Sequence, residues 1–295
     1  MVAKTIKETV AEGISRLKKR EYNNPFLEAY MILEYLLNKE KLFLITHENE
    51  KVDEEIYKKY IELVEKRNTG YPVQYIVHNQ EFMGINFYLE EEVLIPRPDT
   101  EVLVENAIKI AKSDYFPHKS IKALDIGTGS GAIAVSFGYY CREADVLGID
   151  INPKAVEVAR RNVKSNKLDN VKIIKGDMFM EKFDFPNEKY DIIMSNPPYI
   201  KSEDIEKLQL EVSTYEPKNA LDGGVSGLKF HSQILRIVPN YLNDKSVLII
   251  EIGWDQAEEV VKTMRKIKGF KKVEVKKDIA KKDRIVVGYY NRLEV

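Results

Sequence analysis

Residues 195–200, SNPPYI, place an amide, two prolines and an aromatic ring directly after an apolar run. The prolines end the preceding strand, because neither has an N–H to donate. A planar –NH₂ group is a poor nucleophile, and two hydrogen-bond acceptors would hold it in a reactive orientation. Asn196 can supply a side-chain oxygen and Pro197 a backbone carbonyl, while Pro198 stiffens the loop and Tyr199 packs on the acceptor group. These residues fit methyl transfer to a planar nitrogen by positioning and charge stabilisation.

A glycine-rich turn follows an earlier strand, where residues 124–131 read LDIGTGSG. Glycines let the backbone turn tightly and approach a ligand closely. Asp150 ends the next strand, about twenty residues on, where a carboxylate can accept hydrogen bonds from two ribose hydroxyls. Because a sulfonium suits a methyl-transfer site, we expect S-adenosylmethionine as cofactor and S-adenosylhomocysteine as product. The predicted loop contacts are Gly127, Thr128, Gly129, Ser130 and Gly131.

A third strand ends in KGDMF at residues 175–179. Asp177 could accept a hydrogen bond from an adenine amino group, and Met178 or Phe179 could lie against the ring. Each of these segments taken alone also fits an ordinary turn at a strand end. Gly127 and Gly129, followed by Ala132, match the dinucleotide fingerprint as well, so a nicotinamide cofactor stays open at this point.

Strands and helices alternate from residue 121 onward, which predicts an α/β domain with a mostly parallel sheet. The predicted strands are residues 121–126, 145–150, 171–175, 190–195, 246–252, 271–277 and 284–290. The predicted helices between them are residues 132–140, 154–166, 228–241 and 255–266. The last two strands are joined by a short polar link and should pair antiparallel. Such a seven-stranded, Rossmann-like sheet is closer to class I methyltransferases than to the dinucleotide-binding order.

The first seventy residues predict a small helical domain. A helix is expected over residues 5–19, a second after the Asn24 cap and Pro25, and a third after the Asp53 cap. Residues 71–96 are rich in aromatic and β-branched residues, with strand-like runs at 74–77 and 82–89, and predict a β-hairpin connector. We therefore expect domains at residues 1–70, 71–96 and 97–295.

Composition excludes several classes of protein. The chain has 295 residues, of which 44% are hydrophobic, and a net charge of −1, so no global field attracts nucleic acid. The single cysteine, Cys141, excludes an internal disulfide framework, and four scattered histidines offer no metal-ligand spacing. With no membrane span or signal peptide visible in the sequence, we expect a cytoplasmic monomer that makes no direct contact with nucleic acid or membrane.

Taken together, LDIGTGSG, Asp150, GDMF and SNPPYI resemble the class I methyltransferases that modify planar nitrogen. LIPRPDTE at residues 94–101, YEPKNAL at 215–221 and GGVSGL at 223–228 are similar to the HemK/PrmC family. This resemblance implies a glutamine methyltransferase acting on the Gly-Gly-Gln loop of class I peptide chain release factors. It also places Thr100 and Glu101 near the methionine end of the cofactor, and residues 216–224 at the border of the active site. The helical domain is then expected to dock the substrate.

Three other functions compete with this hypothesis. A nucleic-acid amino methyltransferase would share NPPY but should carry a basic recognition domain, and residues 1–70 are mixed in charge. An NAD-dependent oxidoreductase would need an acid or base for hydride transfer, and no histidine lies at a predicted strand end. A non-enzymatic binding module would leave NPPY unexplained.

Overall fold

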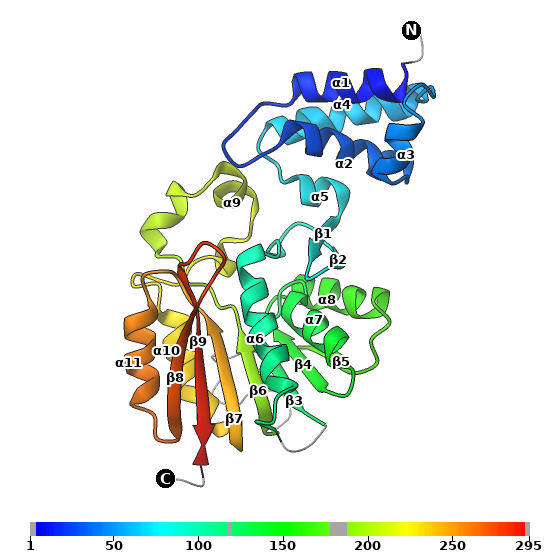
Figure 1. The fold of residues 1–295 in the computed structure, drawn as a ribbon. Coiled ribbons are helices and arrows are strands. Elements are labelled where there is room, and N and C mark those ends of the chain that lie inside the picture. Colours follow the sequence, from blue (N-terminus) through cyan, green and yellow to red (C-terminus); the bar gives the residue numbers. More distant parts are fainter. Residues whose placement is uncertain (1–3, 117–119, 178–187, 293–295) are drawn as a thin grey trace. The chain divides into compact units, whose positions relative to one another are not determined.

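The computed structural model describes residues 4–116, 120–177 and 188–292. The chain divides into two compact units (Figure 1). The first contains Met1–Asn79 together with Leu208–Tyr215, and the second contains Gln80–Lys207 and Glu216–Val295. Met178 and Phe179, the predicted adenine contacts, lie outside the described residues.

The first unit is helical, as expected. Its helices are α1 (Ile6–Arg16), α2 (Pro25–Leu37), α3 (Lys41–Thr46), α4 (Glu54–Asn68), α5 (Val73–Val77) and α9 (Leu210–Tyr215). Asn24 caps α2 by accepting hydrogen bonds from two backbone amides, and Asp53 caps α4 by accepting one. A capping box between Thr5 and Glu8 starts α1. Residues 74–77, expected as a strand, instead form α5.

A buried arginine joins segments of the first unit that are far apart in the sequence. Arg67 is 1% exposed, and its guanidinium binds both carboxyl oxygens of Glu28, at 3.0 and 2.7 Å. It also donates to the Tyr71 carbonyl and forms an ion pair with Glu211 at 3.0 Å. A buried charge is stable only when it is paired and hydrogen-bonded. Arg67 therefore holds α9 on a unit that otherwise comes from the start of the chain.

The second unit is built around a seven-stranded sheet. Its strands are β3 (Lys122–Ile126), β4 (Asp145–Asp150), β5 (Val171–Lys175), β6 (Tyr190–Ser195), β7 (Leu242–Glu251), β8 (Phe270–Lys277) and β9 (Asp283–Asn291). The order is β5-β4-β3-β6-β7-β9-β8. β9 pairs antiparallel with both β7 and β8, and the other neighbouring strands pair parallel. This arrangement confirms the predicted sheet and its antiparallel end pair.

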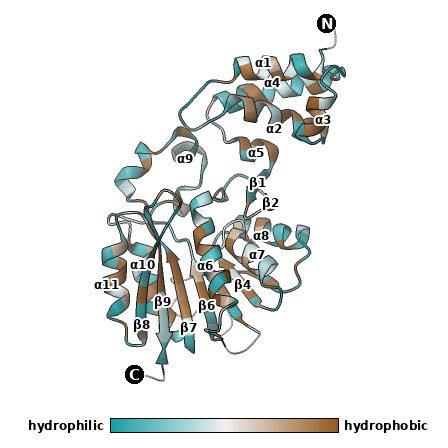
Figure 2. Cartoon of the chain, viewed as in Figure 1, coloured by the Kyte–Doolittle hydropathy of each residue, from teal (hydrophilic) through white to brown (hydrophobic). Residues whose placement is uncertain are grey.

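Helices cover both faces of this sheet, because its inner strands are apolar on both sides. Ala123 and Val247 pack into a core with α6 (Glu101–Ala111), α7 (Ala132–Tyr140) and α8 (Pro153–Ser165). Their neighbours Leu124 and Leu248 point to the opposite core, which contains α10 (Lys229–Ile237) and α11 (Ala257–Arg265). Figure 2 shows the inner strands as predominantly hydrophobic and the outer surface of α11 as mixed.

Short elements complete the described chain. The hairpin of β1 (Asn79–Phe82) and β2 (Ile85–Tyr88) buries Phe82, Ile85 and Phe87 in the core beside α6 and α7, which confirms the hairpin part of the predicted connector. The 3₁₀ turns are η1 (Pro98–Thr100), η2 (Ser202–Lys207), η3 (Lys218–Ala220) and η4 (Val238–Asn240). No helix in the described part of the chain is both long and apolar enough to cross a membrane.

Candidate active site

The predicted cofactor and acceptor residues meet where three strands end. Gly127 follows β3, Asp150 closes β4 and Asn196 follows β6. β3 pairs with β4 on one side and with β6 on the other, so its last residue, Ile126, lies opposite both Ile149 and Ser195. From β3, the next strands along the chain, β4 and β5, lie on one side, and β6 lies on the other side of β3. Ligands of open α/β sheets bind at such a switch point.

The glycine loop leaves open space beside the end of β3. Gly127 and Gly129 have φ values of 74° and 57°, in the left-handed region, and a Cβ at either position would meet nothing within 4 Å. Gly131, with φ 84°, instead packs against Ala159 of α8. The first two glycines therefore let a ligand approach the backbone, whereas the third lets α7 and α8 pack closely.

Two carboxyl groups, the half-buried Asp150 and the buried Asp125, organise this loop. Asp150 accepts hydrogen bonds from the backbone amides of Gly129 and Asn152, each at 2.8 Å, and burial raises its pKa although both bonds lower it. Asp125 accepts from the Thr128 hydroxyl at 2.6 Å and from the Ala134 amide, and burial raises its pKa to about 7. Asp150 therefore ties the loop to β4 and also faces the cavity.

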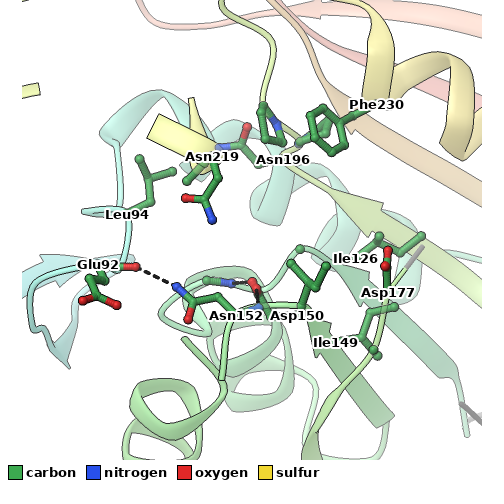
Figure 3. Close-up of a pocket in the computed structure, with 17 residues that line it drawn as sticks. Glu92, Leu94, Ile126, Ile149, Asp150, Asn152, Asp177, Asn196, Asn219 and Phe230 are labelled. Carbon is green, nitrogen blue, oxygen red and sulfur yellow. Dashed lines mark hydrogen bonds between the residues drawn. The ribbon is translucent and has the colours of Figure 1, made fainter. Parts of the chain in front are cut away.

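A cavity of about 300 Å³ lies in front of these strand ends, within the range of small-molecule sites. Figure 3 shows Asn196 and Asn219 facing it from one side and Asp150 and Asn152 from the other. The predicted site residues that line it are Gly127, Gly129, Asp150, Asp177, Asn196, Pro197 and Pro198. The structure thus brings the predicted cofactor and acceptor segments to one cavity.

Other predicted contacts lie outside the lining of this cavity. The Thr128 hydroxyl faces Asp125, and the Ser130 carbonyl accepts from Asn162. The Glu101 carboxyl accepts from the Met83 amide at 2.7 Å and so holds the turn of the β1–β2 hairpin. The cofactor contacts predicted for these three residues stay predictions.

The NPPY segment is held by residues from three other elements. Asn196 donates its Nδ2 proton to the Thr100 hydroxyl at 3.1 Å. The Tyr199 hydroxyl donates to Glu251 at 3.1 Å, at the end of β7, and its carbonyl accepts from Gln256. Thr100 and Tyr199 therefore support the segment, and neither lines the cavity.

Several lining residues were not predicted individually. Glu92 and Asn152 close one side of the cavity, where Asn152 donates to the Glu92 carbonyl at 2.9 Å, and Leu94 lies beside them. Asn219 and Phe230 line the opposite side. Leu94 and Asn219 fall within the stretches that carried the family resemblance, but for Asn152 and Phe230 only the folded sheet reveals the position.

Glu216 joins the two stretches that the resemblance had singled out. Its carboxyl forms an ion pair with Arg97 and accepts from the Ile95 amide at 3.3 Å. LIPRPDTE and YEPKNAL therefore lie side by side at the border of the cavity.

Comparisons with known proteins agree with this geometry. A model described as "PrmC N-terminal domain" matches residues 8–77, and one described as "Methyltransferase domain" matches residues 117–286. The crystal structure of a methyltransferase from Pyrococcus furiosus has a TM-score of 0.51 and 18% identity, with 71% of this chain and 91% of that chain covered. This likeness confirms the class I methyltransferase fold.

Proteins named release factor glutamine methyltransferase are similar to nearly the whole chain. The Clostridium acetobutylicum protein is 39% identical over 96% of this chain and 97% of its own length. The Clostridium botulinum protein is 36% identical over 95% and 98%. These matches confirm the resemblance inferred from the motifs. The chain therefore belongs to the release factor glutamine methyltransferase family.

Proposed function

We propose that this chain transfers a methyl group from S-adenosylmethionine to the side-chain amide nitrogen of the glutamine in the Gly-Gly-Gln motif of class I peptide chain release factors. One observation carries the proposal: the Asn196 amide lies at the end of β6, on the wall of the cavity, with its Nδ2 engaged by Thr100. Its oxygen is thereby left to accept a hydrogen bond from a planar amino group. The relatives named above support glutamine as that group.

The residues at the other side of the cavity fit the cofactor. Asp150 receives hydrogen bonds from the backbone amides of Gly129 and Asn152, and the Ile151 amide also lowers its pKa. Its carboxylate still lines the cavity, where its remaining acceptor capacity suits ribose hydroxyls. The open space at Gly127 and Gly129 suits a ligand that presses on the backbone. Asp177 lines the same cavity and is assigned to the adenine amino group. S-adenosylmethionine, when bound, supplies a methyl group attached to positively charged sulfur.

Asn196 and Pro197 activate the acceptor by position. The Asn196 side-chain oxygen takes one N–H of the glutamine amide, and the Pro197 carbonyl takes the other. The nitrogen lone pair then forms the new N–C bond while the electron pair of the broken S–C bond stays on sulfur, and the nitrogen afterwards releases one proton to solvent. Both oxygens stabilise positive charge that develops on nitrogen, so no side-chain base is required.

The remaining parts of the chain are assigned to the protein substrate. Residues 1–70 and the connector 71–96 dock the body of the release factor, so that remote binding energy positions the glutamine. Residues 97–295 carry the chemistry, apart from the α9 segment that groups with the helical unit. We propose that the chain works as a cytoplasmic monomer. Its net charge of −1 gives nucleic acid no general attraction.

A competition assay tests the substrate. The purified chain is given methyl-labelled S-adenosylmethionine together with a class I release factor, total RNA and DNA. We expect label on the release factor and none on a variant whose Gly-Gly-Gln glutamine is replaced. Preferential labelling of RNA or DNA would overturn the substrate assignment in favour of a nucleic-acid amino methyltransferase.

A further inference from the structure

The carboxyl group of Glu251 is buried directly behind the NPPY segment. Glu251 is the last residue of β7 and is 1% exposed. Its Oε1 accepts from the Tyr199 hydroxyl at 3.1 Å, whereas Oε2 is buried and has no partner of ordinary hydrogen-bond geometry among the described residues. The Thr100 hydroxyl also interacts with this carboxyl. Burying a carboxyl group is costly, so its position calls for a reason.

Thr100 connects this carboxyl to Asn196. The Asn196 Nδ2 atom donates to the Thr100 hydroxyl oxygen at 3.1 Å. A hydroxyl has one proton to donate, and an ionised carboxylate can only accept. A Thr100 hydroxyl that directs its proton to Glu251 can only accept from Asn196. An amide that must donate to Thr100 presents its NH₂ on that side and its oxygen on the other.

We propose that Glu251 is a positioning residue that fixes, through Thr100, which end of the Asn196 amide faces the acceptor group. The inference rests on the proposed function, because only an acceptor with N–H donors makes the choice of end matter. With Oδ1 towards the glutamine amide, Asn196 accepts a hydrogen bond and orients the nitrogen. With Nδ2 in that place, donor would face donor, and the glutamine nitrogen would be turned away.

The same carboxyl also anchors the other end of the segment. Tyr199 donates to Glu251 and accepts from Arg284 at 3.3 Å, and burial raises the pKa of the Tyr199 hydroxyl. Asn196 and Tyr199, three positions apart, are thus tied to one buried group with two stiff prolines between them. This arrangement holds the backbone carbonyl of Pro197, the second proposed acceptor, as well as the Asn196 side chain.

The charges around Glu251 predict how the device responds to pH. Burial raises the pKa of Glu251 to about 7, while Thr100, Arg284 and Tyr199 lower it and Asp99 raises it further. His231, on α10, has its Nε2 at 2.9 Å from the Glu251 backbone carbonyl, and burial lowers the pKa of its ring. Once protonated, the carboxyl can donate to Thr100, whose own proton is then free for the Oδ1 of Asn196, so that the amide can turn over. The orienting effect is therefore lost as pH falls through about 7.

A double-mutant cycle tests the proposal with saturating S-adenosylmethionine and release factor. We expect Glu251→Gln and Thr100→Val each to lower kcat about tenfold at pH 8, the size of a lost hydrogen bond to a charged group, with cofactor Kd within about twofold. Thr100→Ser, which keeps the hydroxyl, should retain activity. In an Asn196→Ala background both substitutions should have little further effect, because they act through Asn196. Wild-type kcat should fall below about pH 7, and that of Glu251→Gln should not.

The matched control is another buried carboxyl on the same sheet. Asp191 is 5% exposed and accepts from the Lys122 amide and Asn243 at the opposite end of β6, so Asp191→Asn should leave kcat unchanged. Equal losses from Glu251→Gln with and without Asn196, a parallel loss of cofactor affinity, or unchanged kcat would each overturn the proposal.

A measurement without substrate separates this inference from the proposed function. In protein labelled with ¹⁵N-asparagine, the Asn196 side-chain NH₂ signal should show a hydrogen-bonded proton that Thr100→Val removes and Glu251→Gln broadens. An unchanged signal in both variants would overturn the proposed orienting role of Glu251 and Thr100, even if the release factor is methylated. If the spectra change as expected but no substrate is methylated, the proposed function is rejected and the orienting role of Glu251 and Thr100 is retained.

Discussion

Replacing Asp150 with alanine should weaken cofactor binding more than any other single change at the glycine loop. In the structure, each of its two oxygens accepts a hydrogen bond from a backbone amide at 2.8 Å, one from Gly129 and one from Asn152. The carboxylate also faces the cavity. Two ribose hydroxyls would donate to this carboxylate from the cavity. Each hydrogen bond to a charged group contributes about 1.5–3 kcal/mol. Two such bonds amount to about 3–6 kcal/mol, or a loss of roughly 10²–10⁴ in affinity.

Calorimetric titration with S-adenosylmethionine and S-adenosylhomocysteine measures this loss. Asp145, exposed at the opposite end of the same strand, provides the matched control, and Asp145→Ala should bind as the wild type does. Asp150→Asn should bind with intermediate affinity, because its amide keeps one acceptor oxygen. Affinity of Asp150→Ala within a few-fold of the wild type would refute the assignment, as would tight binding of NAD by the unmodified chain.

Three further changes test other parts of the structure. Asn196→Ala should leave cofactor affinity nearly intact and lower turnover by about 10²–10³, like the loss of one preorganised group at an oxyanion site; unchanged turnover at saturation would contradict the two-acceptor mechanism. Arg67→Met leaves the buried Glu28 and the half-buried Glu211 without their cation, so it should destabilise the helical unit by about 3–5 kcal/mol; limited proteolysis should then cut within Leu208–Tyr215, and undiminished resistance would argue against this role of Arg67. Burial raises the pKa of Glu251 from 4.5 to about 7. The protonated carboxyl group therefore stabilises the folded chain fully below about pH 4.5, and this stabilisation is lost as pH rises through 7. The free energy of unfolding should therefore fall relative to that of Glu251→Gln by on the order of 3 kcal/mol across this window, and parallel urea-unfolding curves for the two proteins would contradict it.

Much of the fold follows from local patterns in the sequence. The seven strands of the large sheet lie within a few residues of their predicted ranges, because most of them are short apolar runs bounded by polar or glycine-rich turns. The caps at Asn24 and Asp53 start helices where predicted, since a capping side chain acts on amides two or three residues away.

Other features depend on contacts that no local pattern contains. Residues 74–77 carry β-branched and aromatic side chains but form α5, where Val73, Tyr75 and Ile76 are buried. Burial here overrides the β propensity of the segment. The grouping of Leu208–Tyr215 with the helical unit depends on contacts such as that of Arg67 with Glu211, across nearly half of the chain.

The candidate site shows the same division. Asp150 and Asn196 could be predicted because strand ends of a parallel sheet meet at one edge, whatever lies between them in sequence. Glu251 could not, because it appears in the sequence as the end of an ordinary apolar strand. Its role depends on hydrogen bonds to residues 52 positions before it and, through Thr100, to Asn196.

Fragmentation mass spectrometry of a release factor treated with this chain tests the central claim most directly. The account predicts one added methyl group, on the side-chain nitrogen of the glutamine in the Gly-Gly-Gln motif, and at most a trace of it after treatment with the Asn196→Ala variant for the same short time. A methyl group on the backbone, on another residue or on a carboxylate oxygen would contradict the proposal that Asn196 and Pro197 orient a planar amide nitrogen.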